Sequence, residues 1–383
     1  MFQSSVIEIS KSALKNNLDF VRDKLKKNVR FSSVVKGNAY GHTIEVFVPL
    51  AEEFGVDHFS VHSAEEALAV HEFGKKNPDI MIMGSVDDHE LFWAIEEGIE
   101  FYVFERERLE YAVLHAKKLK SKAKIHIELE TGMNRTGFDK DDLAKAVEYI
   151  NSNREHISVQ GICTHYAGAE SISNYYRIQK QHKIFRDTIK WLKAEGINPK
   201  YKHSSSSAAT IRYPKMQMNM VRVGILQYGF WPTPETFIDY IGDKEDKHDP
   251  LKRILSWKTR VMDTKIVKSG EFIGYGTSFL ALDKMKIATI PVGYSHGFSR
   301  SLSNQGRVLI NGKRVGVIGT VNMNNTIVDI SRIPETKKGD EVVLIGNQGD
   351  MSISVSSFGE MSDQLNYELL TRLPTSIPRV IVE

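Results

Sequence analysis

Lys36 stands at a place where a lysine is unusual. The stretch SSVVKGNAYGH (32–42) begins with residues typical of a buried strand, and Lys36 follows them without any polar residue between. In a parallel barrel the carboxyl ends of the strands form the active site, so Lys36 would lie at its mouth. A desolvated lysine loses proton affinity and becomes a nucleophile that can form a Schiff base. The alternative is a solvated surface lysine, because most lysines are exposed.

The residues before about 225 alternate short apolar runs with amphipathic stretches. One of these, SAEEALAVHEFG (63–74), has apolar residues at helical spacing and a glycine that can end the helix. Strands that alternate with helices predict a parallel sheet covered by helices, and eight such units predict a closed (β/α)8 barrel. We expect its strands at 30–37, 57–63, 79–85, 100–105, 124–131, 159–166, 201–208 and 219–225.

The pattern changes after about residue 240. The segment IGDKEDKHDP (241–250) is charged and ends in proline, as linkers and long loops do. Short strands follow, with an Asn-Gly hairpin turn in INGKR (310–314). We therefore predict an α/β fold: an N-terminal (β/α)8 TIM barrel over 11–240, followed by a C-terminal all-β domain over 241–383 on which residues 1–10 pack. A chain of 383 residues agrees with two domains.

Composition and charge disfavour several classes of protein. The 51 basic and 48 acidic residues give a net charge of +3, which offers no reason to expect nucleic acid or a membrane as a partner. The basic run AKKLKSKAK (116–124) is interpreted as a solvated helix end, with an anion-binding patch as the alternative. The single cysteine, Cys163, cannot form an intrachain disulfide. No apolar run approaches the ~20 residues of a membrane span, and no signal peptide is visible, so we expect a cytoplasmic protein.

A series of motifs along nearly the whole chain resembles, in the same order, the motifs of alanine racemases. The first is the pyridoxal-phosphate lysine motif, here VVKGNAYGH. The barrel half continues with ETGMNRTGF, THYAGAE, HSSSSAA and VRVGILQYG, and the β half with GYGTSFLA, IPVGYSHGFSR and NYELLTRLPTSIPRV. The resemblance implies a pyridoxal 5'-phosphate-dependent isomerase with a barrel and a C-terminal β domain, and it implies no metal.

The resemblance also implies a two-base reaction. Racemisation removes the Cα proton from one face and returns a proton to the other, so each face needs a base. Lys36 is implied for one face and Tyr275 for the other, the tyrosine coming from the partner subunit of a homodimer. A free phenol has a pKa of about 10, so it works near neutral pH only where positive charge or hydrogen bonds stabilise the phenolate. Without the family, Tyr275 would be interpreted as a hairpin aromatic.

Two further barrel residues are implied to touch the cofactor ring. Arg222 would face the pyridine nitrogen, to which an arginine donates without giving up its proton. The ring is then a weaker electron sink, which favours reprotonation at Cα over transamination. An arginine paired with a structural carboxylate is the alternative. His165 would lie against the ring, although a histidine at a strand end can equally be a core residue.

The cofactor phosphate needs hydroxyl and backbone amide donors. Phosphate sites near strands 7 and 8 recur in barrels, and HSSSSAA lies on the expected seventh strand, although a serine run alone is usually a flexible loop. The residues implied for the phosphate are Tyr40, Ser206, Ser207, Gly224, Ile225 and Tyr367.

The substrate carboxylate is implied to meet Arg135 and the backbone amide of Met323, the latter again from the partner subunit. Family members often carry a lysine, sometimes carbamylated, where this chain has Glu128. A glutamate supplies an anion without modification, so we predict that Glu128 pairs with Arg135.

The sequence departs from the family at the entrance, where charged residues of the family are replaced or exchanged. These departures are Glu170, His296, Thr320 and Asn324, while the gate residues Tyr294 and Tyr367 remain. A broad-specificity or other amino-acid racemase on the same scaffold is therefore an alternative to alanine racemisation for peptidoglycan. A decarboxylase of this cofactor class is disfavoured because its glycine-rich segments are absent. A non-catalytic pyridoxal-phosphate carrier would lack the β domain.

Overall fold

The computed structural model describes residues 3–242, 244–355 and 366–383. Over these residues the chain forms two compact units. The barrel unit comprises residues 13–39 and 47–252, and the β unit comprises the residues up to 12, residues 40–46 and those from 253 onward.

Eight parallel strands close into a barrel within residues 30–223, all of which are described. Every predicted barrel strand is present, so the predicted fold class is confirmed. The strands are β2 (Arg30–Val34), β3 (His58–Ser63), β4 (Asp79–Ser85), β5 (Glu100–Val103), β6 (Ala123–Glu128), β7 (Ile157–Cys163), β8 (Tyr201–Ser205) and β9 (Met220–Val223).

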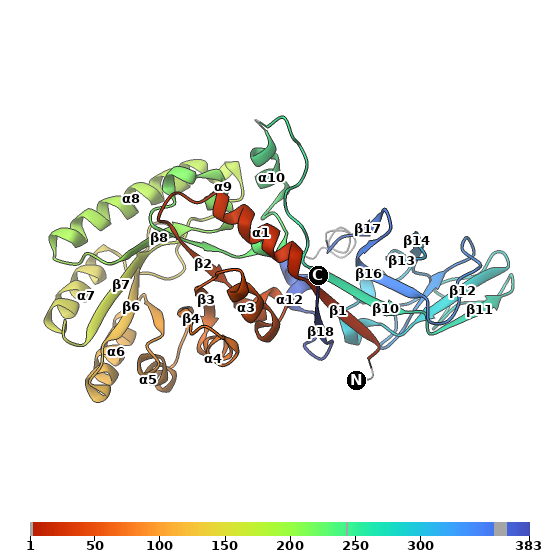
Figure 1. Cartoon of the computed structure of the whole chain (residues 1–383), viewed down its shortest axis with the longest axis horizontal. Helices are drawn as coiled ribbons and strands as arrows, with labels where there is room; N and C mark the ends of the chain where they lie inside the picture. Colours follow the sequence, from red (N-terminus) through yellow and green to blue (C-terminus); the bar gives the residue numbers. More distant parts are fainter. Residues whose placement is uncertain (1–2, 243, 356–365) are drawn as a thin grey trace. The chain divides into compact units, whose positions relative to one another are not determined.

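Helices follow the strands and lie outside the barrel (Figure 1). The helix predicted at 63–74 is α4 (Ala64–Phe73); the Ser63 side chain caps its first turn and Gly74 ends it. No helix in the described residues is both long and apolar enough to cross a bilayer. The other α-helices in the described residues are α1 (Lys11–Asp23), the short left-handed α2 (Lys36–Tyr40), α3 (Ile44–Glu53), α5 (Asp88–Glu96), α6 (Arg106–Leu119), α7 (Lys140–Ser152), α8 (Tyr175–Ala194), α9 (Ser207–Arg212), α10 (Pro234–Ile241) and α12 (Asn366–Thr371).

The interior of the barrel contains a polar layer. Ser32, His58, Glu100, His126 and His203 are each at most 5% exposed. Branched apolar residues usually fill these positions in such barrels. Buried polar groups are stable when they bond to one another, so a hydrogen-bonded network is expected here.

The β unit is built on two sheets. In its described residues a seven-stranded sheet runs β14-β13-β16-β10-β1-β18, with β17 paired to β16, and a three-stranded sheet runs β11-β12-β15. The predicted Asn-Gly hairpin joins β13 and β14, with φ of 50° at Asn311 and 70° at Gly312. The strands are β1 (Ser5–Ser10), β10 (Leu255–Arg260), β11 (Asp263–Val267), β12 (Met285–Ile290), β13 (Arg307–Ile310), β14 (Lys313–Gly316), β15 (Thr326–Asp329), β16 (Glu341–Gln348), β17 (Met351–Ile353) and β18 (Arg379–Val382).

Candidate active site

Lys36 follows β2 at the carboxyl end of the barrel and begins a left-handed turn. The next three residues have φ of 62°, 51° and 54°, in a region that costs residues with a Cβ roughly 1–2 kcal/mol each. Glu66 supports this turn, because its Oε1 accepts the backbone hydrogens of Gly37 and Asn38, at 2.5 and 3.2 Å. Its Oε2 accepts the amide hydrogen of His62 at 2.8 Å. One carboxylate thus holds the backbone on which Lys36 sits.

Lys36 is exposed as a residue at the carboxyl end of β2, yet the surroundings of its amine disfavour a positive charge. The neighbouring protein atoms desolvate the ammonium and lower its pKa. The charges of Arg135 and Arg222 lower the pKa further, and Glu66 opposes them. An amine with reduced proton affinity can act as a nucleophile and as a base near neutral pH.

Arg222, on β9, is buried among uncharged acceptors. Its guanidinium donates to Nδ1 of His203 and to the carbonyl oxygen of Thr164, the latter at 2.9 Å. A longer contact of 3.4 Å reaches Nδ1 of His165. Burial, together with the charges of Arg222, Arg135 and Lys36, lowers the pKa of His165 to about 3. His165 is therefore a neutral ring beside a fixed cation.

The residues predicted to bind phosphate on the barrel meet where β8 and β9 end. Ser206 and Ser207 begin α9, and Gly224 and Ile225 follow β9. The Gly224 amide donates to Oγ of Ser207 at 3.0 Å. The Ser207 hydroxyl hydrogen is thereby left for another acceptor, so this group of residues can offer donors to an anion.

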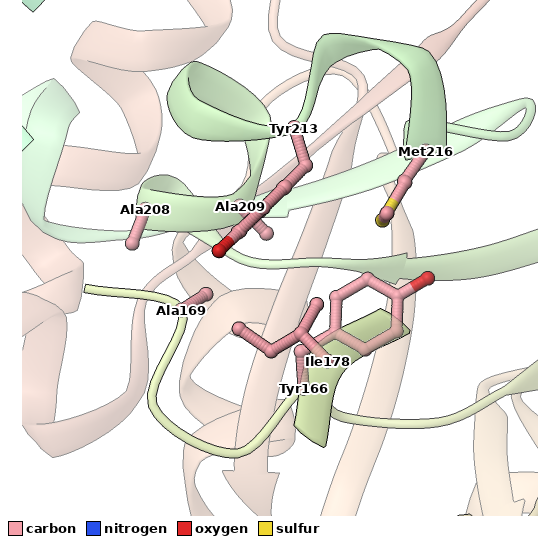
Figure 2. Close-up of a cluster of buried hydrophobic side chains, with 7 residues drawn as sticks. All are labelled: Tyr166, Ala169, Ile178, Ala208, Ala209, Tyr213 and Met216. Carbon is pink, nitrogen blue, oxygen red and sulfur yellow. The ribbon is translucent and has the colours of Figure 1, made fainter. Parts of the chain in front are cut away.

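A buried apolar cluster supports this end of the barrel. Figure 2 shows Tyr166, Ala169 and Ile178 on one side, facing the cluster's side chains from α9 and the turn after it. The complete cluster is Tyr166, Ala169, Ile178, Ala208, Ala209, Tyr213 and Met216. The Tyr166 hydroxyl also accepts from Oγ of Ser204 at 2.9 Å and bonds Nδ1 of His182 at 2.7 Å. Packing and hydrogen bonds together fix the segments that carry His165 and the serines.

The predicted ion pair between Glu128 and Arg135 is absent from the structure, although both residues are described. Glu128 is buried at the end of β6, and its Oε2 accepts from the hydroxyl of Thr136 at 2.8 Å. Arg135 is exposed on the loop after β6. Desolvation raises the pKa of the Glu128 carboxyl, and the charges of Arg222 and Arg135 act against this. The loop turns Thr136 toward Glu128. The Glu128 carboxylate and Arg135 therefore interact through the electrostatic field alone, without an ion pair.

In the β unit, Tyr40 packs beside Tyr367, with ring centroids 5.9 Å apart. The backbone at Gly41 approaches α12 so closely that a Cβ there would lie 1.9 Å from the carbonyl oxygen of Leu370. Gly41 has a φ of 79°, which also favours glycine. The two tyrosines predicted to bind phosphate are thus held next to each other.

Tyr275 and Met323 line one open cavity of about 340 Å³ in the β unit. Its other lining residues are Tyr294, Arg300, Thr320, Val321 and Asn322. Tyr275 is 77% exposed and Met323 is 55% exposed. The structure therefore brings together the two residues that were predicted to act in a neighbouring subunit's site.

Sequence reasoning missed Glu66 and Thr136 as supports of the site. The SAEE segment (63–66) carries a capping-box pattern, which could have drawn attention to Glu66 as a backbone acceptor. No pattern in the sequence indicated that Thr136 would turn toward Glu128.

Comparison with known proteins places this geometry in a family. The family model described as alanine racemase, N-terminal domain, matches residues 9–232, and the one described as alanine racemase, C-terminal domain, matches residues 254–381. An alanine racemase of Leptospira interrogans serogroup Icterohaemorrhagiae serovar copenhageni is 35% identical over 384 residues, which cover 99% of this chain and 96% of that protein.

Solved structures agree with the sequence comparisons. The alanine racemase of Clostridium difficile 630 superposes with a TM-score of 0.91 at 29% identity, covering 100% of this chain and 96% of that one. The alanine racemase of Bartonella henselae with covalently bound pyridoxal phosphate gives a TM-score of 0.83 at 25% identity, covering 99% of each chain. Together with both family models, these matches show that the chain belongs to the alanine racemase family of pyridoxal-phosphate-dependent isomerases.

Proposed function

We propose that the protein interconverts L-alanine and D-alanine, with Lys36 and Tyr275 as the two bases. The observation that carries this proposal is the Lys36 amine at the end of β2, whose pKa is lowered by desolvation and by Arg135 and Arg222. Such an amine can accept and return a proton near neutral pH. The D-alanine formed in the cytoplasm would serve peptidoglycan.

The side chains at the barrel mouth fit pyridoxal 5'-phosphate. Lys36 offers an amine for its aldehyde, and the hydroxyls of Ser206 and Ser207 with the Ile225 amide offer donors for its phosphate, while the Gly224 amide orients the Ser207 hydroxyl. Arg222 offers a donor for an unprotonated ring nitrogen, and neutral His165 can lie against the ring without adding charge. Tyr40 and Tyr367, which pack against each other in the β unit, are the further residues that we propose as phosphate ligands.

Bound pyridoxal phosphate supplies an electrophilic carbon for an amine and an electron-withdrawing ring that acidifies the Cα–H bond of an amino acid. The protein residues then have separate tasks. Lys36 takes or returns the proton at its Nζ on one face of Cα, and Tyr275 does so at its hydroxyl on the other. Arg135 and the Met323 amide orient the substrate carboxylate. Arg222 keeps its own proton, which limits electron withdrawal by the ring and favours return of a proton to Cα.

We also propose a homodimer with shared active sites. Tyr275 is 77% exposed on the wall of an open cavity. A phenol works as a base near neutral pH only beside positive charge or hydrogen bonds that stabilise its anion. An exposed Tyr275 therefore needs a covering surface that carries such groups, and the barrel mouth of a second copy, with Lys36 and Arg135, has that character.

Racemisation of a larger or basic amino acid is the second candidate. Two of the four entrance departures, Thr320 and Asn324, form neutral hydrogen bonds in the structure. Thr320 Oγ1 lies 3.1 Å from Oγ of Ser278, and the Asn324 amide donates to Oγ of Ser295 at 3.0 Å. Thr320 and Asn324 are uncharged, so neither position rejects a longer side chain by its charge, whereas Arg300 on the cavity wall would repel a basic one.

Borohydride reduction followed by peptide mapping tests the site. We expect the reduced cofactor on Lys36, and modification at any other residue would overturn the assignment. Tyr275→Phe should keep the visible absorbance of the lysine-bound cofactor and lose nearly all racemisation. Retained racemisation would exclude Tyr275 as a base, whereas a wild-type protein that binds cofactor without turnover would be a carrier. Rates with L-alanine, L-serine, L-lysine and L-arginine decide between the two substrate classes.

A further inference from the structure

A line of hydrogen bonds crosses the interior of the barrel and ends on Arg222. The guanidinium of Arg222 donates to Nδ1 of His203, and Nε2 of His203 lies 2.8 Å from Nδ1 of His126. Nε2 of His126 lies 2.7 Å from Oε2 of Glu100. The two proposed bases take no part in this line, so its presence needs another explanation.

Only one arrangement of hydrogens satisfies every bond in the line. Arg222 has donors and no acceptor, so Nδ1 of His203 must accept and the hydrogen of this ring must sit on Nε2. Nδ1 of His126 accepts that hydrogen, so His126 also carries its own on Nε2 and donates it to Glu100. Burial, followed by the charge of Arg222, lowers the pKa of His203 well below its usual value, which agrees with a neutral ring.

Glu100 is the anionic end of the line. Burial alone would raise the pKa of its carboxyl, but the hydrogen bond that Nε2 of His126 donates, with His58 close by, outweighs burial and holds the pKa below its usual range. Nε2 of His58 lies 3.6 Å from the same oxygen, and its Nδ1 lies 2.9 Å from Oγ of Ser32. An ionised carboxylate can only accept, so it sets the direction of every hydrogen bond that leads to it.

The line is shielded from solvent. His126 and His203 are 0% exposed and Glu100 is 5% exposed. The ring of Tyr102 lies 6.1 Å from that of His126 and 6.0 Å from that of His203. Gly161 leaves space for the line, because a Cβ there would lie 2.1 Å from Nδ1 of His126. The protein therefore determines which ring nitrogen carries the hydrogen.

Packing alone does not account for these residues. Branched apolar side chains fill such barrels, and they avoid the free energy needed to bury a carboxylate. The other acceptors of Arg222 are the carbonyl oxygens of His203 and Thr164 and Nδ1 of His165, all uncharged. The buried cation Arg222 is connected to one anion, Glu100, through the line of hydrogen bonds.

We propose that Glu100 is a positioning residue: its carboxylate fixes the Nε2–H tautomers of His126 and His203 and thereby keeps an acceptor nitrogen turned toward Arg222. This inference rests on the proposed function, in which Arg222 meets the ring nitrogen of the cofactor. With His203 fixed, the guanidinium keeps one orientation and its donors stay directed at that nitrogen. A displaced guanidinium would leave the nitrogen free to take up a proton, which favours transamination at the expense of racemisation.

The tautomers can be measured directly in the wild-type chain. In full-length protein labelled with ¹⁵N-histidine, we expect Nδ1 of His126 and of His203 to have the chemical shift of an unprotonated nitrogen. Nε2 of both rings should show the one-bond coupling of a protonated nitrogen. A hydrogen on Nδ1 of His203, or on both of its nitrogens, would overturn the inference. This measurement needs no turnover, so it stands or fails separately from the proposed racemase activity.

Glu100→Gln removes the charge with little change of shape. By analogy with carboxylates that orient metal-bound imidazoles, we expect kcat for racemisation to fall about tenfold or more. KM should stay within about twofold, and more pyruvate should form per racemisation. Glu52→Gln is the matched control. Glu52 is 1% exposed and accepts the backbone hydrogens of Lys75 and Lys76, at 2.7 and 3.1 Å, away from this line.

The outcomes separate positioning from general destabilisation. A rise in pyruvate per racemisation in Glu100→Gln but not in Glu52→Gln supports the inference. Wild-type kcat in Glu100→Gln, or equal losses in both variants with unchanged pyruvate formation, would overturn it and leave the racemase proposal intact. If Glu100→Gln does not fold, the histidine tautomers measured in the wild-type protein decide whether the inference holds. A wild-type chain without racemisation would instead refute the proposed function.

Discussion

Oε1 of Glu66 accepts the backbone hydrogen of Gly37 at 2.5 Å, directly after Lys36 in the chain. The same carboxylate also accepts from the amides of Asn38 and His62. In the left-handed turn after Lys36, the amides of Gly37 and Asn38 have Glu66 as their acceptor, while the Ala39 amide donates to the carbonyl oxygen of Val35 at 2.7 Å. Its charge also opposes the lowering of the Lys36 pKa, so one residue acts on both the position and the protonation of the amine.

Glu66→Gln should destabilise the protein by about 1–3 kcal/mol, because one acceptor oxygen becomes a donor that faces a backbone donor. The lost negative charge should lower the pKa of Lys36 further. In cofactor-free protein a lysine-specific reagent should then modify Lys36 at lower pH than in the wild type. Urea unfolding and peptide mapping measure the two effects, with exposed Glu65→Gln as the control. An unchanged labelling profile would argue against the electrostatic effect.

The pH dependence of stability should report on His165, whose pKa is lowered to about 3 by burial and by Arg222, Arg135 and Lys36. A histidine in the unfolded chain titrates near about 6.5, so below that pH the unfolded state binds a proton that the folded state does not. The contribution of the neutral His165 ring to the free energy of unfolding is therefore fully present above about pH 6.5. It is lost as the pH falls toward 3, by at most about 1.4 kcal/mol for each pH unit.

His165→Gln tests this dependence, because glutamine does not titrate. In cofactor-free protein the urea concentration at the unfolding midpoint should decrease when the pH is lowered from about 7.5 to about 5.5. This decrease should be smaller in the variant than in the wild type. The other buried histidines are common to both proteins, so the difference isolates His165. The same fall in both proteins would mean that His165 is protonated alike in the folded and unfolded states.

Gly161→Ala should destabilise the protein by about 1–3 kcal/mol, the usual range for overpacking a core. The new Cβ would lie 2.1 Å from Nδ1 of His126, so the ring must move away from His203 and racemisation should slow as well. Gly242→Ala is the control, because its Cβ would meet no atom closer than 3.4 Å. Thermal melting and racemase assays check both effects. Wild-type melting of Gly161→Ala would show that the imidazole has room to shift.

The barrel and the place of Lys36 could be predicted from the sequence because both depend on local patterns. Each barrel strand is a short run between helical segments, and the carboxyl end of a strand is a position along the chain. The left-handed turn was not predicted, although glycines stand at residues 37 and 41 on either side of it. Three residues with side chains lie between them, and Glu66 holds the amides of Gly37 and Asn38 at the start of the turn, a contact that spacing along the chain does not encode.

The line from Glu100 to Arg222 could not be predicted for a related reason. Its members lie on four different strands, and strand stagger around a barrel decides which side chains meet inside it. The Glu128–Arg135 prediction was wrong because the direction of a loop side chain does not follow from the periodicity of the strand before it. Thr136 faces the carboxylate instead.

Arg379 holds the segment that carries Tyr40, entirely within the β unit. Its guanidinium donates twice to the carbonyl oxygen of Gly41, at 2.8 and 3.2 Å. It also donates to the carbonyl oxygens of Pro374 and Ile377, each at 2.5 Å. Carbonyl groups of two segments are therefore tied together by one planar group, which a lysine cannot reproduce.

Arg379→Lys should destabilise the protein by about 1–3 kcal/mol, because it keeps the charge but loses most of these hydrogen bonds. Pyridoxal phosphate should also bind more weakly, because Tyr40 is a proposed phosphate ligand next to Gly41. Arg372→Lys is the same substitution at an exposed ion pair with Glu368, 2.8 Å apart, and should cost less than about 0.5 kcal/mol. Urea unfolding measures the loss of stability in each variant, and absorbance titration with the cofactor measures the change in cofactor affinity. If Arg379→Lys binds the cofactor as tightly as the wild type while losing stability, Arg379 supports the fold without positioning Tyr40.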